Sequence, residues 1–104
     1  MIRCISLLFF PLKLLLRYVY KQYLFGKIQS RNYDKRFEAV YALKEKYGPS
    51  SIPGLIYILN HKNCDIRHDA AYCLELITGA YNGDSYKKWR SWWKRNKKKI
   101  RKNR

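Results

Sequence analysis

Two stretches of the sequence decide the fold: DKRFEAVYAL at residues 34–43 and DIRHDAAYCL at residues 65–74. They lie 31 residues apart and agree at five of their ten positions, in the pattern D-x-R-x-x-A-x-Y-x-L with an acid at the fifth place. Apolar residues recur in and after each copy at steps of three and four, which place them on one face of an α-helix. The repeat predicts two equivalent amphipathic helices, at residues 34–47 and 65–78, each beginning at an Asp that can cap its first turn.

A further helix is predicted between the two copies. Gly48-Pro49 is expected to end the first helix and Gly79 the second, because glycine readily adopts the left-handed conformation that closes a helix and proline cannot continue one. Residues 52–60 are largely apolar over a helical length and carry Pro53 in the first turn, where proline is favoured. The centre of the chain is therefore predicted to be a repeating helix pair within an all-α fold.

A helix pair of this length with these motif residues resembles the HEAT family, and in particular its short bacterial repeats of the phycobilisome-lyase type. The residues that carry the resemblance are Asp34, Arg36, Ala39, Leu43, Ile52, Pro53, Leu55, Ile56, Leu59, Asp65, Arg67, Ala70, Ala71 and Leu74. They span residues 32–79, about half of the chain. The resemblance implies a short α-solenoid of about two helix pairs whose concave surface binds other proteins. The motif residues that it assigns to contacts between repeats are Asp34, Arg36, Asp65 and Arg67.

Both ends of the repeats need a cap, because two helix pairs alone cannot bury a continuous core. At the C-terminal end we expect a helix over residues 85–97. Its aromatic cap would consist of Tyr86, Trp89, Trp92 and Trp93, with at least one tryptophan partly exposed. An aromatic cage for a ligand is the alternative use of these rings. At the N-terminal end, a helix over residues 11–25 could pack its apolar face on the first repeat.

Positive charge is concentrated in the two flanks of the chain. The 104 residues include 23 Lys and Arg against 7 Asp and Glu, which gives a formal net charge of +16. Every acid lies within residues 34–84, where the charges nearly balance, so that residues 1–33 and 85–104 are purely cationic. An anionic partner is therefore expected to bind the flanks.

The N-terminal flank allows two interpretations. Residues 4–16 are nearly all apolar but fall short of the roughly 20 residues that span a bilayer, and no cleavage site of a secretory signal follows them. Lys13, Arg17 and Lys21 stand four residues apart and predict one cationic stripe beside a wide apolar face. Such a helix can lie on an anionic membrane or can cap the repeats, and the sequence leaves both open.

The C-terminal flank can bind anions of either kind. Its candidate contact residues are Lys87, Lys88, Arg90, Lys94, Arg95, Lys97, Lys98, Lys99, Arg101 and Lys102. They could neutralise lipid headgroups or the phosphates of a nucleic acid, or could merely keep the protein in solution. Residues 97–104 are predicted to be a disordered tail when unbound.

No metal, cofactor or small-molecule substrate is expected. His61, Cys64, His68 and Cys73 are zinc-ligand types, but His68 and Cys73 align with Phe37 and Ala42 of the first copy and are explained by helix packing. Candidates for acid–base or nucleophilic catalysis are too few for an enzyme. The three cysteines contain no C-x-x-C pair, which favours a reducing, cytoplasmic setting.

These features predict an N-terminal segment at residues 1–31, a repeat domain at 32–96 and a basic tail at 97–104. The expected function is a non-catalytic adaptor that binds another protein and lies at the inner face of an anionic membrane. The alternative is a nucleic-acid-binding protein that uses the basic C-terminal helix and tail.

Overall fold

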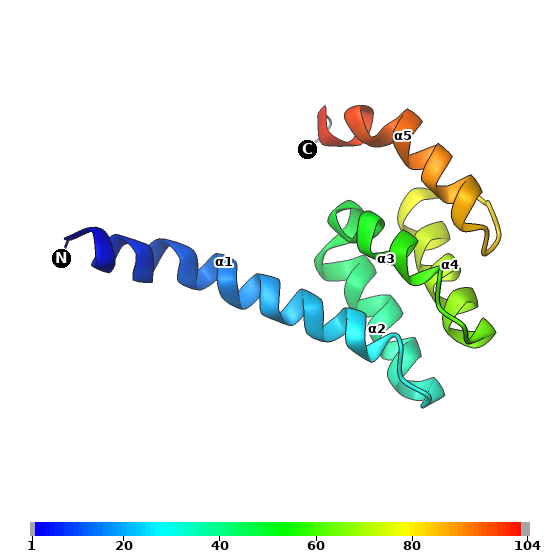
Figure 1. The fold of residues 1–104 in the computed structure, drawn as a ribbon, viewed down its shortest axis with the longest axis horizontal. Helices are drawn as coiled ribbons and strands as arrows, with labels where there is room; N and C mark the ends of the chain where they lie inside the picture. The colour runs from blue at the N-terminus through cyan, green and yellow to red at the C-terminus, as the bar shows by residue number, and fades with distance from the viewer. Residues whose placement is uncertain (1, 103–104) are drawn as a thin grey trace.

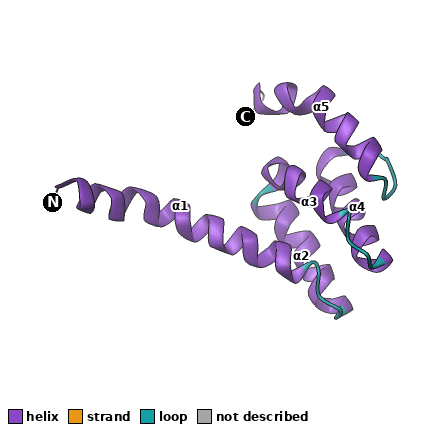
Figure 2. Cartoon of the chain, in the orientation of Figure 1, coloured by secondary structure: helices purple, strands orange, loops and turns teal. Residues whose placement is uncertain are grey.

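The computed structural model describes the backbone of residues 2–102 and the side chains of residues 12–101. Its elements are α1 (Ile2–Lys27), α2 (Tyr33–Lys46), the 3-10 turn η1 (Gly48–Ser51), α3 (Ile52–Ile58), α4 (Cys64–Thr78) and α5 (Tyr86–Lys102). Residues 2–102 contain helices, turns and loops but no strand (Figure 2). The predicted all-α fold is confirmed.

Helices α2, α3 and α4 form the centre of the molecule, with α4 against both α2 and α3. The C-terminal end of α1 packs on α2, and α5 packs on α3. Figure 1 shows α1 running far out from this centre, and the outer ends of α1 and α5 pointing to the same side. The radius of gyration of 15.4 Å exceeds the roughly 13 Å of a compact domain of this size, because α1 projects.

Asparagines cap the two motif helices. The side-chain oxygen of Asn32 accepts a hydrogen bond from the amide of Lys35 (3.1 Å), and that of Asn63 accepts one from the amide of Asp65 (2.8 Å). The prediction that Asp34 and Asp65 are the caps is wrong, because the extended residue lies two positions earlier in each copy. Both aspartates lie in the first turn instead, where a negative charge favours the positive end of the helix dipole.

The helix ends agree in part with the prediction. Gly48 follows α2 with a φ of 52°, and Gly79 closes α4 with a φ of 74°. Helix α5 continues past residue 97 to Lys102, because Ile100 still packs against the core. The sequence predicts a disordered tail from residue 97 on when the protein is unbound, whereas residues 97–102 continue α5 in this structure, and residues 103–104 lie outside the described part of the chain.

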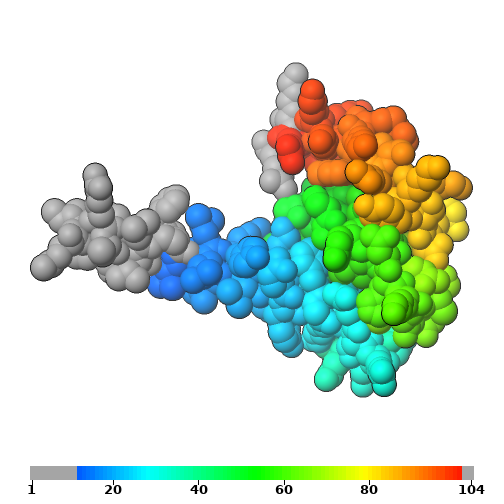
Figure 3. All heavy atoms as spheres, in the orientation of Figure 1, coloured from blue at the N-terminus to red at the C-terminus, as the bar shows by residue number. Residues whose placement is uncertain are grey.

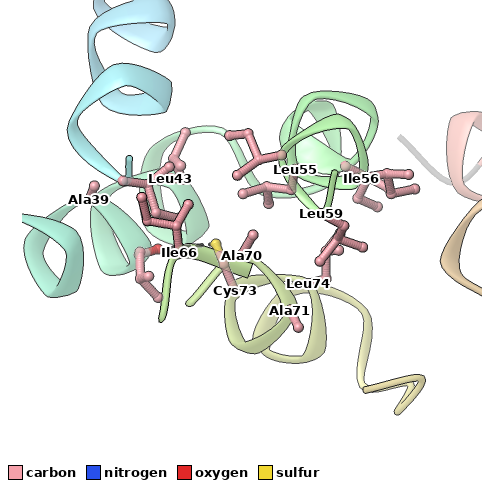
Figure 4. Packing of buried hydrophobic residues seen from close by; sticks show 14 of the residues in the cluster. Ala39, Leu43, Leu55, Ile56, Leu59, Ile66, Ala70, Ala71, Cys73 and Leu74 are labelled. Carbon is pink, nitrogen blue, oxygen red and sulfur yellow. Dashed lines mark hydrogen bonds between the residues drawn. The ribbon is translucent and has the colours of Figure 1, made fainter. Parts of the chain in front are cut away.

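The core lies between α2, α3 and α4 (Figure 4). Leu43, Leu55 and Leu74 are fully buried there, and so are the small residues Ala39 and Ala70. Small side chains at these positions let the helix backbones approach each other. The core is closed at one end by Leu24 of α1 and by Ile28 in the turn that follows α1, and at the other end by Trp89 of α5, and all three are fully buried.

Arg36 joins three parts of the chain. Its Nη1 donates hydrogen bonds to the carbonyl oxygens of Ser30 and Arg31, at 3.0 Å each, and so fixes the turn before α2. Its Nε contacts Asp69 Oδ2 of α4 at 2.6 Å. The guanidinium is nearly buried, with 8% of its side chain exposed.

Arg67 repeats these contacts 31 residues later. Its Nη1 donates to the carbonyl oxygens of His61 and Lys62, at 2.9 Å each, and its Nε lies 3.6 Å from Asp84 Oδ2. Each motif arginine thus holds the turn before its own helix and pairs with an acid further along the chain. Asp34 and Asp65 form no ion pair with any residue among 12–101.

Lys27 of α1 forms an ion pair of the same kind as those of Arg36 and Arg67, one position earlier in the order of elements. Its Nζ lies 2.7 Å from Glu38 Oε2 of α2, the fifth-place acid of the first motif. This hydrogen bond raises the pKa of Lys27 and lowers the pKa of Glu38. The fifth-place acids Glu38 and Asp69 are therefore the partners that link successive elements.

Candidate functional site

Most of the exposed large apolar and aromatic residues in the described part of the chain lie on α1. Residues 12–20, here called the projecting segment, run out from the rest of the molecule (Figure 3). Its exposed large apolar and aromatic residues Leu12, Leu14, Leu15, Leu16, Tyr18 and Val19 are each 51–61% exposed. Three successive leucines cannot share one helix face, so this apolar surface extends around the helix. Contiguous exposed apolar surface of this kind marks an interaction site.

The other end of α1 is part of the core. Leu24 and Ile28 are buried against the repeats, and the ring of Phe25 packs on Gly54 of α3. A Cβ added at Gly54 would lie 2.5 Å from Phe25 Cζ, so glycine allows this close approach. Residues 24–28 thus take the position expected of an N-terminal cap, and within the projecting segment Arg17 and Tyr20 contact the edge of the core at Tyr47.

Two cations of α1 surround Tyr47 at the junction with α2. Arg17 Cζ lies 4.9 Å, and Lys21 Nζ 5.8 Å, from the centre of the Tyr47 ring. Tyr47 Oη donates a hydrogen bond to the carbonyl oxygen of Arg17 (2.8 Å), and Arg17 Nη2 donates one to the carbonyl oxygen of Lys46 (3.2 Å). These contacts fix the direction in which α1 leaves the core.

The predicted stripe of Lys13, Arg17 and Lys21 therefore has two environments. Lys13 lies on the projecting segment and is exposed. Arg17 and Lys21 lie where α1 meets Tyr47. Sequence reasoning missed Tyr47 as their partner, because this contact joins residues about 30 positions apart and no local sequence pattern predicts it.

An open groove lies between α1 and η1, with a volume of about 430 Å³. It is lined by Leu14, Arg17, Tyr18, Lys21, Tyr47, Pro49 and Ser50. The lining therefore holds two cations and the side-chain hydroxyls of Tyr18, Tyr47 and Ser50 next to an exposed leucine, and no carboxylate. We call it the Arg17 groove.

Helix α5 has one aromatic and one cationic face. The exposed cations are Lys87, Lys88, Arg90, Lys94, Arg95, Lys98, Lys99 and Arg101. Lys97 is half-buried, and the side chain of Lys102 lies outside the described residues. No basic side chain of α5 up to Arg101 forms an ion pair within residues 12–101. The face is thus available to an external anion.

The aromatic face of α5 lies against the core. Trp89 is fully buried and its Nε1 donates a hydrogen bond to the carbonyl oxygen of Gly83 (2.7 Å). Trp92 contacts it edge to face, with ring centres 5.7 Å apart. Tyr86, Trp92 and Trp93 are half-buried. Partial exposure of at least one tryptophan was expected, and two have it.

The candidate zinc ligands have other partners or surroundings. His61 Nδ1 accepts a hydrogen bond from the amide of Asn63 (3.0 Å), and Cys73 Sγ donates one to the carbonyl oxygen of Val40 (3.4 Å). Burial raises the pKa of the Cys73 thiol to about 12, so it is neutral in ordinary buffers. Within the described side chains, no three His, Cys, Asp or Glu residues gather closely enough to hold a metal ion.

An aromatic strip on α2 and α4 was also missed. Phe37 lies between Tyr33 and Tyr41, with ring centres 6.1 and 4.8 Å away. Tyr41 and Tyr72, the equivalent tyrosines of the two copies, bring their hydroxyl oxygens to 3.1 Å. This hydrogen bond raises the pKa of Tyr72. The shared tyrosine of the motif was the available signal, and it marks a contact between the copies.

Over the described residues, no helix combines the length and the apolar character needed to cross a membrane.

Comparisons with known proteins give no family assignment. No family model, no characterised protein and no solved structure matches the chain.

Proposed function

We propose that the protein is a non-catalytic adaptor, a short α-solenoid of the HEAT type, that binds another protein while attached to an anionic membrane surface at the cytoplasmic face. The observation that carries the membrane part is the projecting segment. It exposes leucines on several faces of α1, beside Lys13 and Arg17. Exposed apolar and cationic groups together fit the boundary between acyl chains and anionic headgroups.

The energies support reversible attachment. Full burial of a leucine side chain contributes about 1.5–3 kcal/mol, and each Lys or Arg near an anionic surface contributes about 1 kcal/mol. Partial burial of the leucines with a few cations would therefore supply several kcal/mol. The cationic face of α5 can add to this, since the outer ends of α1 and α5 point to the same side (Figure 1).

The adaptor part of the proposal has two supports. The equivalent contacts of Arg36 and Arg67, and the pairing of Tyr41 with Tyr72, follow the 31-residue offset, as stacked repeats would. The aromatic strip leaves Tyr33 and Phe37 exposed on the surface of α2. Exposed aromatic side chains are enriched where proteins bind each other.

Nucleic-acid binding through α5 is the second candidate, and the exposed cations of that helix favour it. Phosphate contacts would give binding without sequence preference and a steep dependence on salt. A nucleic acid would leave the leucines of the projecting segment in water, and for this reason we place the membrane first.

The test is vesicle flotation with variants that leave the core intact. Leu12→Gln, Leu15→Gln and Leu16→Gln together remove three exposed apolar groups from α1. The control changes Tyr33, Tyr57 and Tyr81 to Gln; these three tyrosines are more exposed than the three leucines but lie outside α1.

We expect the leucine variant to lose binding to vesicles of phosphatidylcholine and phosphatidylglycerol, and the tyrosine control to float like the unaltered protein. Equal flotation of the two variants would refute insertion of the projecting segment. Capture from lysate that disappears after nuclease treatment, without vesicle binding, would support the nucleic-acid candidate.

A further inference from the structure

The Arg17 groove combines groups that bind phosphate. Arg17 and Lys21 are four residues apart on α1, so they share one helix face, and both line the groove. The guanidinium has five N–H donors, of which the carbonyl of Lys46 takes one. Two cations at one site, with no carboxylate in the lining, match a ligand group with two negative charges.

The neutral lining residues fit the same ligand. The hydroxyl groups of Tyr18 and Ser50 add hydrogen-bonding groups beside the cations. Ser50 Oγ donates its proton to the carbonyl oxygen of Tyr47 (2.9 Å), so Tyr18 is the hydroxyl that can donate to a ligand. An arginine fork with a phenol donor suits the several oxygens of a phosphate better than a single carboxylate.

We propose that the Arg17 groove binds the phosphate of a phosphomonoester. The membrane source of this chemistry is a lipid whose headgroup ends in a phosphate, and the other source is a soluble phosphomonoester. The lipid source deepens the proposed function and rests on it. Leu14 both lines the groove and belongs to the projecting segment, so a phosphate held there would lie at the level where the apolar side chains enter the membrane.

The groove can be separated from general electrostatic attraction by two variants of equal charge. Arg17→Gln with Lys21→Gln removes both cations of the groove. The control, Lys87→Gln with Lys88→Gln, removes two exposed cations from α5. Binding of the full chain is measured on phosphatidylcholine vesicles that contain either phosphatidic acid, a phosphomonoester, or phosphatidylserine, adjusted to the same surface charge.

We expect the unaltered protein to bind phosphatidic acid vesicles about tenfold more tightly than phosphatidylserine vesicles, the factor of about one charge-assisted hydrogen bond. The groove variant should bind both vesicles equally. The α5 control should weaken both by the same factor and keep the tenfold preference.

If the groove variant unfolds, Arg17→Lys replaces it, because that change keeps the charge, loses the fork and should reduce the preference. A soluble arm titrates glycerol 3-phosphate at constant ionic strength and follows the amide resonance of Ser50.

The outcomes distinguish the groove from the proposed function. Vesicle binding without a headgroup preference, or a preference that survives in the groove variant, overturns the phosphate site and leaves membrane attachment standing. Failure to bind any vesicle, with a Ser50 response to glycerol 3-phosphate that the groove variant abolishes, overturns membrane attachment and assigns the groove to a soluble phosphomonoester. No response in either arm refutes both.

Discussion

Replacing Arg36 with Met should destabilise the fold far more than the same change at Arg67, although the two residues occupy equivalent positions. The side chain of Arg36 is 8% exposed and contacts Asp69 at 2.6 Å, whereas that of Arg67 is 30% exposed and lies 3.6 Å from Asp84. Both arginines donate two further hydrogen bonds to backbone carbonyls. The difference between the two variants therefore reports mainly the burial and geometry of the ion pair.

Loss of Arg36 leaves the carboxylate of Asp69, 25% exposed, without its partner. Breaking a buried ion pair by removing one partner costs about 3–5 kcal/mol, and the remaining access of water to Asp69 reduces our expectation to about 2–3 kcal/mol. An exposed ion pair contributes about 0–1 kcal/mol, so with its carbonyl contacts Arg67→Met should cost about 1 kcal/mol.

The assay is urea denaturation followed by far-UV circular dichroism, with the m-value checked for a common unfolding transition. Asp69→Asn added to Arg36→Met should recover part of the loss, because it removes the unpaired charge. The reasoning is refuted if Arg67→Met costs as much as Arg36→Met, or if the second substitution recovers nothing.

Three further predictions concern the core. At pH 8 a thiol reagent should modify exposed Cys64 in the folded protein and reach Cys73 only on unfolding, so that rapid labelling of Cys73 would contradict its burial. The free energy of unfolding should fall from about pH 9 towards pH 12 by about 1 kcal/mol per pH unit through Cys73, because the unfolded thiol loses its proton first, and Cys73→Ala should lack that part of the slope in a denaturation series. Gly54→Ala should lower the melting temperature despite the better helix propensity of alanine, and should raise it in a Phe25→Ala background; a rise in both backgrounds would show that the ring simply moves aside.

The sequence alone was sufficient to predict the helices that repeat. Periodicity and glycine predicted α2, α4 and their ends, since a helix of fourteen or fifteen residues contains enough apolar positions to define its face. The caps were misassigned because Asn and Asp are nearly equivalent capping residues, and only the backbone conformation of Asn32 shows which of two neighbouring candidates lies outside the helix. The extension of α5 depends on a single apolar residue, Ile100, within a run of cations that resembles a disordered tail.

The candidate site was less predictable than the fold. Charge counts alone predict anion binding in the flanks; the structure shows that the cations of α5 are exposed, and the binding itself stays a prediction. The Arg17 groove depends on Tyr47 and η1 meeting α1 across a long stretch of chain, which composition and spacing cannot specify. The division of α1 into a buried end and an exposed end likewise depends on where the core stops, and a nearly uniform apolar sequence contains no such boundary.

The series of contacts through Lys27, Arg36 and Arg67 has a consequence for the length of the molecule. Each motif unit contains its own asparagine cap, its own arginine and the acid that its predecessor needs, so a third unit could be inserted without redesign of its neighbours. Leu24 and Trp89, which close the two ends of the core, would still pack against the same residues of the first and last units. Such an insertion would, however, move α1 and α5 apart and turn one relative to the other. The number of units therefore sets the distance and the angle between α1 and α5, whose outer ends point to the same side when there are two units (Figure 1).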